Sequence, residues 1–153
     1  MDRAVIRFLR ASLLWLTAGV SLGVAMAVHP AWTRYRPVHL HILLLGFVTM
    51  MIAGVAYHVF PRFAATPLHA PKLQTVHFVL ANVGLVLVAC GFAARADGSP
   101  LGVWLLGSGG GLSALGAYLL GWNLWRTLDH AAIPPTRLPA ARPMPVVERP
   151  AMR

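Results

Sequence analysis

Two histidines separated by a single residue, His39 and His41, have the clearest capacity for chemistry in this sequence. On an α-helix, residues two positions apart are rotated about 200° from each other, so these rings point to nearly opposite faces. Neutral imidazole is a preferred ligand of haem iron and of copper. A helix that contains this pair therefore offers one candidate metal ligand to each of two neighbours.

The pair lies at the start of an apolar segment of membrane length, residues 38–60, which contains no Asp, Glu, Lys or Arg. At 1.5 Å per residue, a helix of this length extends about 35 Å, which is enough to cross a bilayer. Pro37 suits the first turn of such a helix, and Pro61 is expected to end it. Polar groups within spans are costly, so we treat both histidines as functional candidates.

Composition indicates that this is an integral membrane protein. It is 58% hydrophobic and 11% charged, and a soluble domain of this length has too little interior for that much apolar surface. Three further spans are expected, at residues 8–28, 73–94 and 101–125. The predicted fold is an all-α integral membrane protein, a bundle of four transmembrane helices over residues 1–128. A Pro- and Arg-rich tail, residues 129–153, is expected to be disordered.

The net charge of +9 is distributed as membrane topology requires, not as a nucleic-acid groove, so no nucleic-acid partner is expected. Three of the 13 Lys and Arg residues flank one side of the expected bundle, namely Arg34, Arg36 and Arg95, and the other ten flank the opposite side. Basic residues concentrate on the cytoplasmic side of membrane proteins. The sequence therefore predicts a bacterial inner-membrane protein with both termini in the cytoplasm and with His39 and His41 at the outer face.

Other polar and small residues of the spans give weaker signals. His58 and His77 are expected on the inner side, where they either meet in a second metal or haem site or form separate interfacial hydrogen bonds; we favour hydrogen bonding. Cys90, the lone cysteine, excludes an intrachain disulfide and is expected to be a small buried residue. Two small-residue motifs predict close approach between helices, and these are Gly19-x-x-x-Gly23 and Gly107-x-x-x-Gly111.

Residues 37–63, PVHLHILLLGFVTMMIAGVAYHVFPRF, resemble the His-x-His helix of haem-copper oxidase subunit I, most closely in its cbb-type and nitric oxide reductase branches. The resemblance rests on His39-Leu40-His41, Gly46-Phe47, Gly54-Val55-Ala56-Tyr57 and Pro61-Arg62. It implies that His39 holds one haem and His41 another, toward the outer side of the membrane. A full subunit I has about twelve spans in three arcs of four. This chain has one arc and is identified as a small four-span member.

The resemblance implies a haem protein, and geometry suggests how one arc makes a complete site. If three copies form a closed ring, His39 of one copy and His41 of the next clamp one b-type haem at each interface. A haem with two axial histidines has no open position, so it suits electron transfer, with a quinol or a cytochrome as redox partner. Three arginines are on the side that allows pairing with haem propionates, namely Arg34, Arg36 and Arg95.

Three alternatives to this electron carrier stay open. One copy lacks the further histidine-bearing helices that complete a haem-copper centre, so an oxygen or nitric oxide reductase would have to be built from repeated copies. A sensor that binds gas, haem or copper is the second alternative, and a purely structural membrane subunit is the third. The sequence contains no Cys-x-x-Cys-His, which excludes covalently attached c-type haem.

Overall fold

Proline residues and a side-chain cap define where the first helix begins and ends. The computed structural model describes residues 2–131. Helix α1 (Arg3–Val28) starts at Asp2, whose carboxylate accepts a hydrogen bond from the Ala4 amide at 3.1 Å, and stops at His29. Pro30 then begins a 3-10 turn, η1 (Pro30–Tyr35), that leads into the second span.

The second span is one continuous helix whose middle is widened. It consists of α2 (Arg36–His41), a π-helical stretch η2 (Ile42–Thr49) and α3 (Met50–Phe63). Pro37 occupies the first turn, as predicted. The expectation that Pro61 ends the helix is wrong, because α3 continues to Phe63 and Ala65 then adopts a left-handed φ of 48°. So close to the end of the helix, proline removes one amide donor without preventing a last turn.

The remaining two spans are α4 (Pro71–Ala96) and α5 (Leu101–Ala131), joined by a tight turn in which Gly98 has a φ of 78°. Four helices are therefore long and apolar enough to cross a membrane, which confirms the all-α membrane fold. Helix α5 continues into the first residues of the expected tail. The rest of that tail, residues 132–153, lies outside the described residues.

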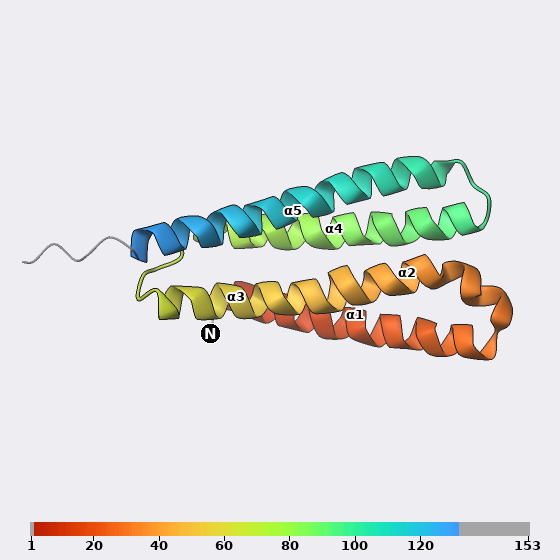
Figure 1. Cartoon of the computed structure of the whole chain (residues 1–153), viewed down its shortest axis with the longest axis horizontal. Coiled ribbons are helices and arrows are strands. Elements are labelled where there is room, and N and C mark those ends of the chain that lie inside the picture. Colours follow the sequence, from red (N-terminus) through yellow and green to blue (C-terminus); the bar gives the residue numbers. More distant parts are fainter. Residues whose placement is uncertain (1, 132–153) are drawn as a thin grey trace, which may run out of the picture.

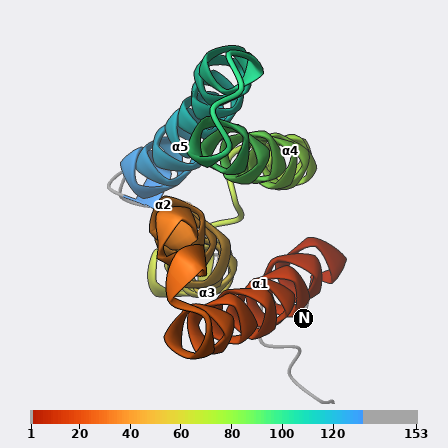
Figure 2. The ribbon, with the colours of Figure 1, turned by 90° about the vertical axis from the view of Figure 1, so that its right-hand side faces the viewer.

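The helices form two antiparallel hairpins that lie side by side (Figures 1 and 2). We call the end with the start of α1 and the end of α5 the terminal end, and the opposite end the His39 end. The hydrophobic core lies toward the terminal end and comprises Val5, Phe8, Met50, Ala53, Tyr57, Leu68 and Leu85. Cys90 is exposed on α4, so the expectation of a buried cysteine is wrong.

Glycines facing one another bring α4 and α5 into backbone contact. A Cβ on Gly109 would lie 2.7 Å from the carbonyl oxygen of Gly84, and one on Gly102 would lie 2.8 Å from that of Gly91. The prediction for Gly107 and Gly111 is wrong within residues 2–131, where a Cβ on either glycine would have nothing within 4 Å. The face of α5 that meets α4 is the one with glycines spaced seven residues apart.

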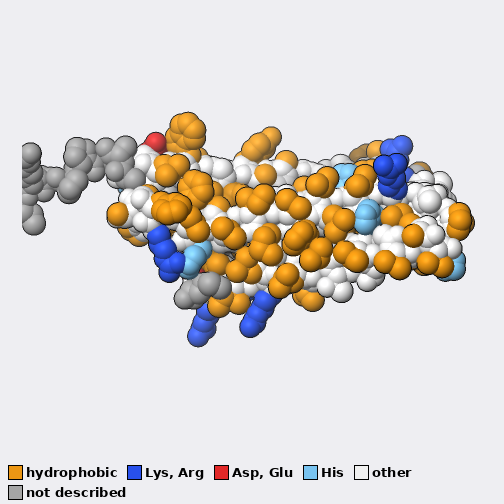
Figure 3. Space-filling model, turned by 60° about the horizontal axis from the view of Figure 1, so that its bottom comes forward, with side chains coloured by type: hydrophobic (Ala, Val, Ile, Leu, Met, Phe, Trp, Pro, Cys, Tyr) orange, Lys and Arg blue, Asp and Glu red, His pale blue; other side chains and the backbone are white. Residues whose placement is uncertain are grey.

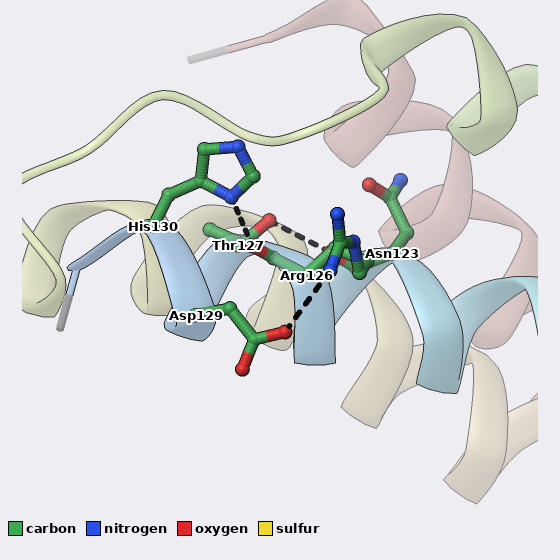
Figure 4. Close-up of polar contacts among 5 residues, drawn as sticks. All are labelled: Asn123, Arg126, Thr127, Asp129 and His130. Atoms are coloured by element: carbon green, nitrogen blue, oxygen red, sulfur yellow. Dashed lines mark hydrogen bonds and ion pairs between the residues drawn. The ribbon is translucent and has the colours of Figure 1, made fainter. Parts of the chain in front are cut away.

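A buried polar contact closes the terminal end. The side-chain amide of Asn123 accepts a hydrogen bond from the Ala70 amide at 2.9 Å and donates one to the Ala70 carbonyl at 3.0 Å. The Thr127 hydroxyl accepts a hydrogen bond from the His69 amide at 3.0 Å. It donates one to the Asn123 carbonyl at 2.7 Å (Figure 4). Because Asn123 and Thr127 are fully buried, these bonds fix the α3–α4 connection against α5.

Candidate metal-ligating site

His39 is held between α2 and α1. Its Nδ1 atom lies 2.8 Å from the carbonyl oxygen of Gly19. The ring also covers Gly23, where a Cβ would lie only 2.9 Å from the Cε1 atom of His39. The predicted close approach at Gly19 and Gly23 is therefore present, and its effect is to make room for an imidazole as well as for the helix backbone.

His41 faces the other hairpin. Its Nδ1 atom lies 2.8 Å from the carbonyl oxygen of Pro37, one turn earlier in the same helix. Its ring stacks at a tilt of 36° on Phe92 of α4, with a centroid distance of 4.6 Å. The two histidines therefore engage different helices, as the rotation of about 200° between them predicts.

The two hydrogen bonds determine which nitrogen each ring can offer. A carbonyl oxygen only accepts, so in both residues Nδ1 is the protonated nitrogen. In the neutral imidazole, the lone pair that remains is on Nε2. A metal-ligating histidine typically donates its other ring N–H to a carbonyl or carboxylate, which fixes the ring orientation. His39 and His41 both have this arrangement.

Each ring adjoins its own groove. The groove at His39 has a volume of about 440 Å³ and is lined by Gly23, Met26, Ala27, Thr33, Arg36 and Leu40. The groove at His41 has a volume of about 330 Å³ and is lined by Leu45, Val88, Phe92, Leu106, Gly110 and Ser113. Both volumes fall in the range of cofactor sites, and both grooves are mostly apolar.

The three arginines expected near the pair have different surroundings. Arg34 lies 3.3 Å from the carboxylate of Asp97 and is half exposed, and Tyr35 donates a hydrogen bond to the same carboxylate at 2.9 Å. Arg36 is exposed and lines the groove of His39. Arg95 is exposed in the last turn of α4. Arg36 is therefore the one of the three that shares a groove with a histidine of the pair.

His58 and His77 have separate partners. Arg62 donates a side-chain hydrogen bond to Nε2 of His58. His77 is buried and packs against Phe8. Its Nδ1 atom lies 3.1 Å from the hydroxyl oxygen of Tyr57. Within residues 2–131, no group of three or more His, Cys, Asp or Glu side chains is arranged to hold a metal ion. These contacts favour hydrogen bonding for both residues, and a second site remains only a hypothesis.

Two features of the site were not predicted from the sequence. The first is the hydroxyl of Ser113, which is buried without a hydrogen-bond partner in the described part of the chain and lines the His41 groove. The second is the π-helical stretch that follows His41. There the side-chain hydroxyl of Thr49 donates a hydrogen bond to the Leu44 carbonyl, five residues back, at 2.8 Å. Stretches of π-helix are frequent at functional sites. A serine inside an apolar run is the only sequence signal for either feature.

Comparison with known proteins identifies the family to which the chain is similar. Residues 3–144 match the family model described as cytochrome c and quinol oxidase polypeptide I. The chain is also similar to the cbb3-type cytochrome c oxidase subunit CcoN1 of Stutzerimonas stutzeri, with 27% identity over 157 aligned positions. This alignment covers 83% of the chain but 33% of that relative, so the chain spans about a third of the relative's length.

Proposed function

The chain belongs to the cytochrome c and quinol oxidase polypeptide I family, and on this premise we propose that it is a haem b electron carrier of the bacterial inner membrane. Members of this family typically bind haem and copper. The observation on which the proposal depends is the pair of free Nε2 atoms, one on His39 and one on His41, each at its own groove. Such a ring nitrogen is an axial ligand of haem iron.

The residues around the pair fit a porphyrin better than a small ion. Both grooves are mostly apolar and open, whereas a bare metal ion needs several donor atoms converging on one point. The donors of one copy do not converge in this way, since His39 and His41 serve different grooves. A copper site would therefore need ligands beyond those that the described residues of one copy bring together.

The open sides of the grooves support sharing of the haem between copies. Each groove is lined by one histidine of the pair, so a second copy would supply the other ligand. We propose that His39 of one copy and His41 of the next hold the same haem in a closed homotrimer. The relative is about three times as long as the part that aligns with this chain, so three copies together have about its length. This ratio supports a trimer.

The residues of this chain would then position the haem and exclude other ligands. Gly19 and Pro37 orient the two axial rings through their carbonyl groups. Phe92 restricts the rotation of His41 by stacking on it. Arg36 is the candidate partner of a haem propionate, because this residue lines the His39 groove. A haem held by His39 of one copy and His41 of the next would supply one-electron transfer.

Spectra and stoichiometry of the purified protein test this function. We expect sharp low-spin bands in the reduced-minus-oxidised spectrum, one b-type haem per chain by pyridine haemochrome, and a trimer by native mass spectrometry. His39→Ala and His41→Ala each abolish the low-spin bands. His29→Ala is the matched control, since His29 is exposed at the same end and its ring packs on Trp32.

The same measurements separate the alternatives. A high-spin spectrum that changes on addition of carbon monoxide indicates an open position and favours a gas sensor or an oxygen or nitric oxide reductase. A monomer that contains no haem after expression with ample haem supply contradicts the proposed function.

The orientation in the membrane is a further part of the proposal. We propose that the His39 end faces the outside of the cell and that both termini are cytoplasmic, since the terminal end has the greater number of basic residues. The haem would then lie close to the outer surface, within reach of a quinol or a cytochrome. Labelling of cysteines introduced into the η1 and α3–α4 connections in intact cells tests this orientation.

A further inference from the structure

A groove on α1 at the terminal end is lined by three arginines. It has a volume of about 240 Å³ and is formed by Arg3, Ile6, Arg7 and Arg10. The arginines are spaced four and three residues apart, so their side chains lie on one face of the helix. Within residues 2–131, the ion pairs of arginines with carboxylates are those of Arg34 and Arg126. The groove therefore presents a concentration of positive charge.

A second, apolar hollow continues along the same helix. It has a volume of about 300 Å³ and is lined by Ala11, Leu14, Trp15 and Ala18 of α1 and by Asn82 of α4. The indole of Trp15 donates a hydrogen bond to the side-chain oxygen of Asn82 at 3.0 Å, and the amide nitrogen of Asn82 donates to the Phe78 carbonyl at 2.8 Å. Because these polar groups have partners within the bundle, the hollow offers a mainly hydrocarbon surface.

The two hollows follow one another along a single stripe of α1. Arg7, Ala11, Leu14 and Ala18 are spaced four, three and four residues apart, which places them in one row on the helix surface. From Arg10 to Ala18 the helix rises about 12 Å, roughly the depth of one leaflet. Figure 3 shows blue basic side chains at both ends of the molecule and an apolar, orange surface between them. The basic groove lies at the end of the bundle and the apolar hollow lies deeper in the membrane span. A phospholipid places its charged head group and its acyl chains in the same order.

We propose that this stripe of α1 binds one anionic phospholipid. Arg3, Arg7 and Arg10 hold the phosphodiester, since guanidinium groups pair with phosphate through two parallel hydrogen bonds. One acyl chain lies along Ala11, Leu14 and Ala18. Basic pockets at the membrane surface bind anionic head groups. A zwitterionic head group such as phosphatidylcholine gains less from three positive charges, because its ammonium group is repelled by the same arginines. The site is separate from the His39 groove, which uses Gly23, Met26 and Ala27 of α1.

Native mass spectrometry of the full chain in mild detergent tests the head group. We expect one dioleoylphosphatidylglycerol per chain to stay bound at a concentration at which dioleoylphosphatidylcholine does not. Replacing Arg3, Arg7 and Arg10 by Gln weakens retention about a hundredfold. Arg126→Gln is the control, because Arg126 lies at the same end but is 3.4 Å from Asp129 and outside the groove. Equal retention of both lipids, or retention by the triple Gln variant, overturns the proposal.

Loss of three positive charges can also alter membrane insertion, so a second variant keeps the charge. Replacing the same three arginines by Lys preserves the topology signal but removes the planar donor pairs. We expect this variant to insert and to bind phosphatidylglycerol more weakly than the unchanged chain but more strongly than the Gln variant. Unchanged affinity in the Lys variant shows that bidentate pairing does not hold the head group, and it overturns the assigned arginine contacts.

The hydrocarbon part of the site has its own test. Ala18→Phe fills the apolar hollow, whereas Val20→Phe adds a ring to a neighbouring exposed position that does not line it. We expect Ala18→Phe to weaken retention of the long-chain lipid and Val20→Phe to leave it unchanged. Inorganic phosphate at millimolar concentration does not displace the lipid if the acyl chain contributes. Displacement by phosphate, or no effect of Ala18→Phe, shows that the hollow does not hold an acyl chain and contradicts the proposal.

Discussion

The Nδ1 atom of His39 lies 2.8 Å from the carbonyl oxygen of Gly19, a contact that joins the second span to the first. The glycine four residues further along α1, Gly23, leaves the space that the ring occupies. Gly19 thus supplies the acceptor and Gly23 supplies the room. Together they fix the orientation of the His39 ring, with Nδ1 in the hydrogen bond. The Nε2 atom is then left to bind the proposed haem iron.

Adding a methyl group at Gly23 tests this arrangement. In Gly23→Ala the new Cβ would lie 2.9 Å from Cε1 of His39, so the ring has to move. We expect weakened or shifted low-spin haem bands together with a loss of about 1–3 kcal/mol of stability, since inserted methyl groups strain a packed contact. Absorption spectra and thermal unfolding measure the two effects.

Gly121→Ala is the matched control for this variant, because nothing lies within 4 Å of a Cβ built at Gly121. It is expected to keep the spectrum of the unchanged protein and to be at least as stable, since alanine favours the helix over glycine. Identical haem spectra for Gly23→Ala and Gly121→Ala would show that the position of the His39 ring does not affect the haem.

Arg36 and Arg34 are expected to differ in their effect on the haem. A positive charge near a haem stabilises the reduced form, so Arg36→Gln lowers the midpoint potential. Arg34→Gln lowers it less, because Arg34 is already paired with the Asp97 carboxylate at 3.3 Å. Spectroelectrochemical titration of the two variants gives both shifts. A larger shift in Arg34→Gln than in Arg36→Gln contradicts the assignment of Arg36 to the haem.

Asn123 is expected to matter for stability without affecting the haem. In Asn123→Ala the amide and carbonyl of Ala70 both lose their side-chain partner, which costs about 1–3 kcal/mol because Asn123 is fully buried. Thermal unfolding reports this loss, while the low-spin bands keep their positions. Arg126→Gln, one turn away on the exposed face, serves as the control and changes stability by less than about 1 kcal/mol.

The fold was largely predictable because long apolar runs interrupted by proline leave few alternatives to membrane helices. The rotation between His39 and His41 was predictable as well, since it depends only on helix geometry. The contacts of the glycines were not predictable, because helix α5 has glycines on several faces. Gly84 and Gly91 of α4 are seven residues apart, and this spacing is matched on α5 by Gly102 and Gly109.

Other features could not be predicted, because they depend on packing between helices. Whether Cys90 is buried or exposed is decided by the rotation of α4 against α5. The partner of Arg34 lies 63 positions later in the sequence, in the turn after α4, so no local pattern indicates the pair. The amino-acid composition of residues 42–49 does not indicate the π-helix, since Ile, Leu, Phe and Val suit either an α-helix or a π-helix.

The sharing of one haem between neighbouring copies is tested most directly by expressing two differently tagged variants together, His39→Ala and His41→Ala. In a ring, an interface is complete wherever the intact His39 of one variant meets the intact His41 of the other. Random mixing therefore restores about a quarter of the low-spin haem of the unchanged protein, whereas neither variant alone has any. The contradicting result is a mixed oligomer, isolated through both tags, that shows no low-spin bands.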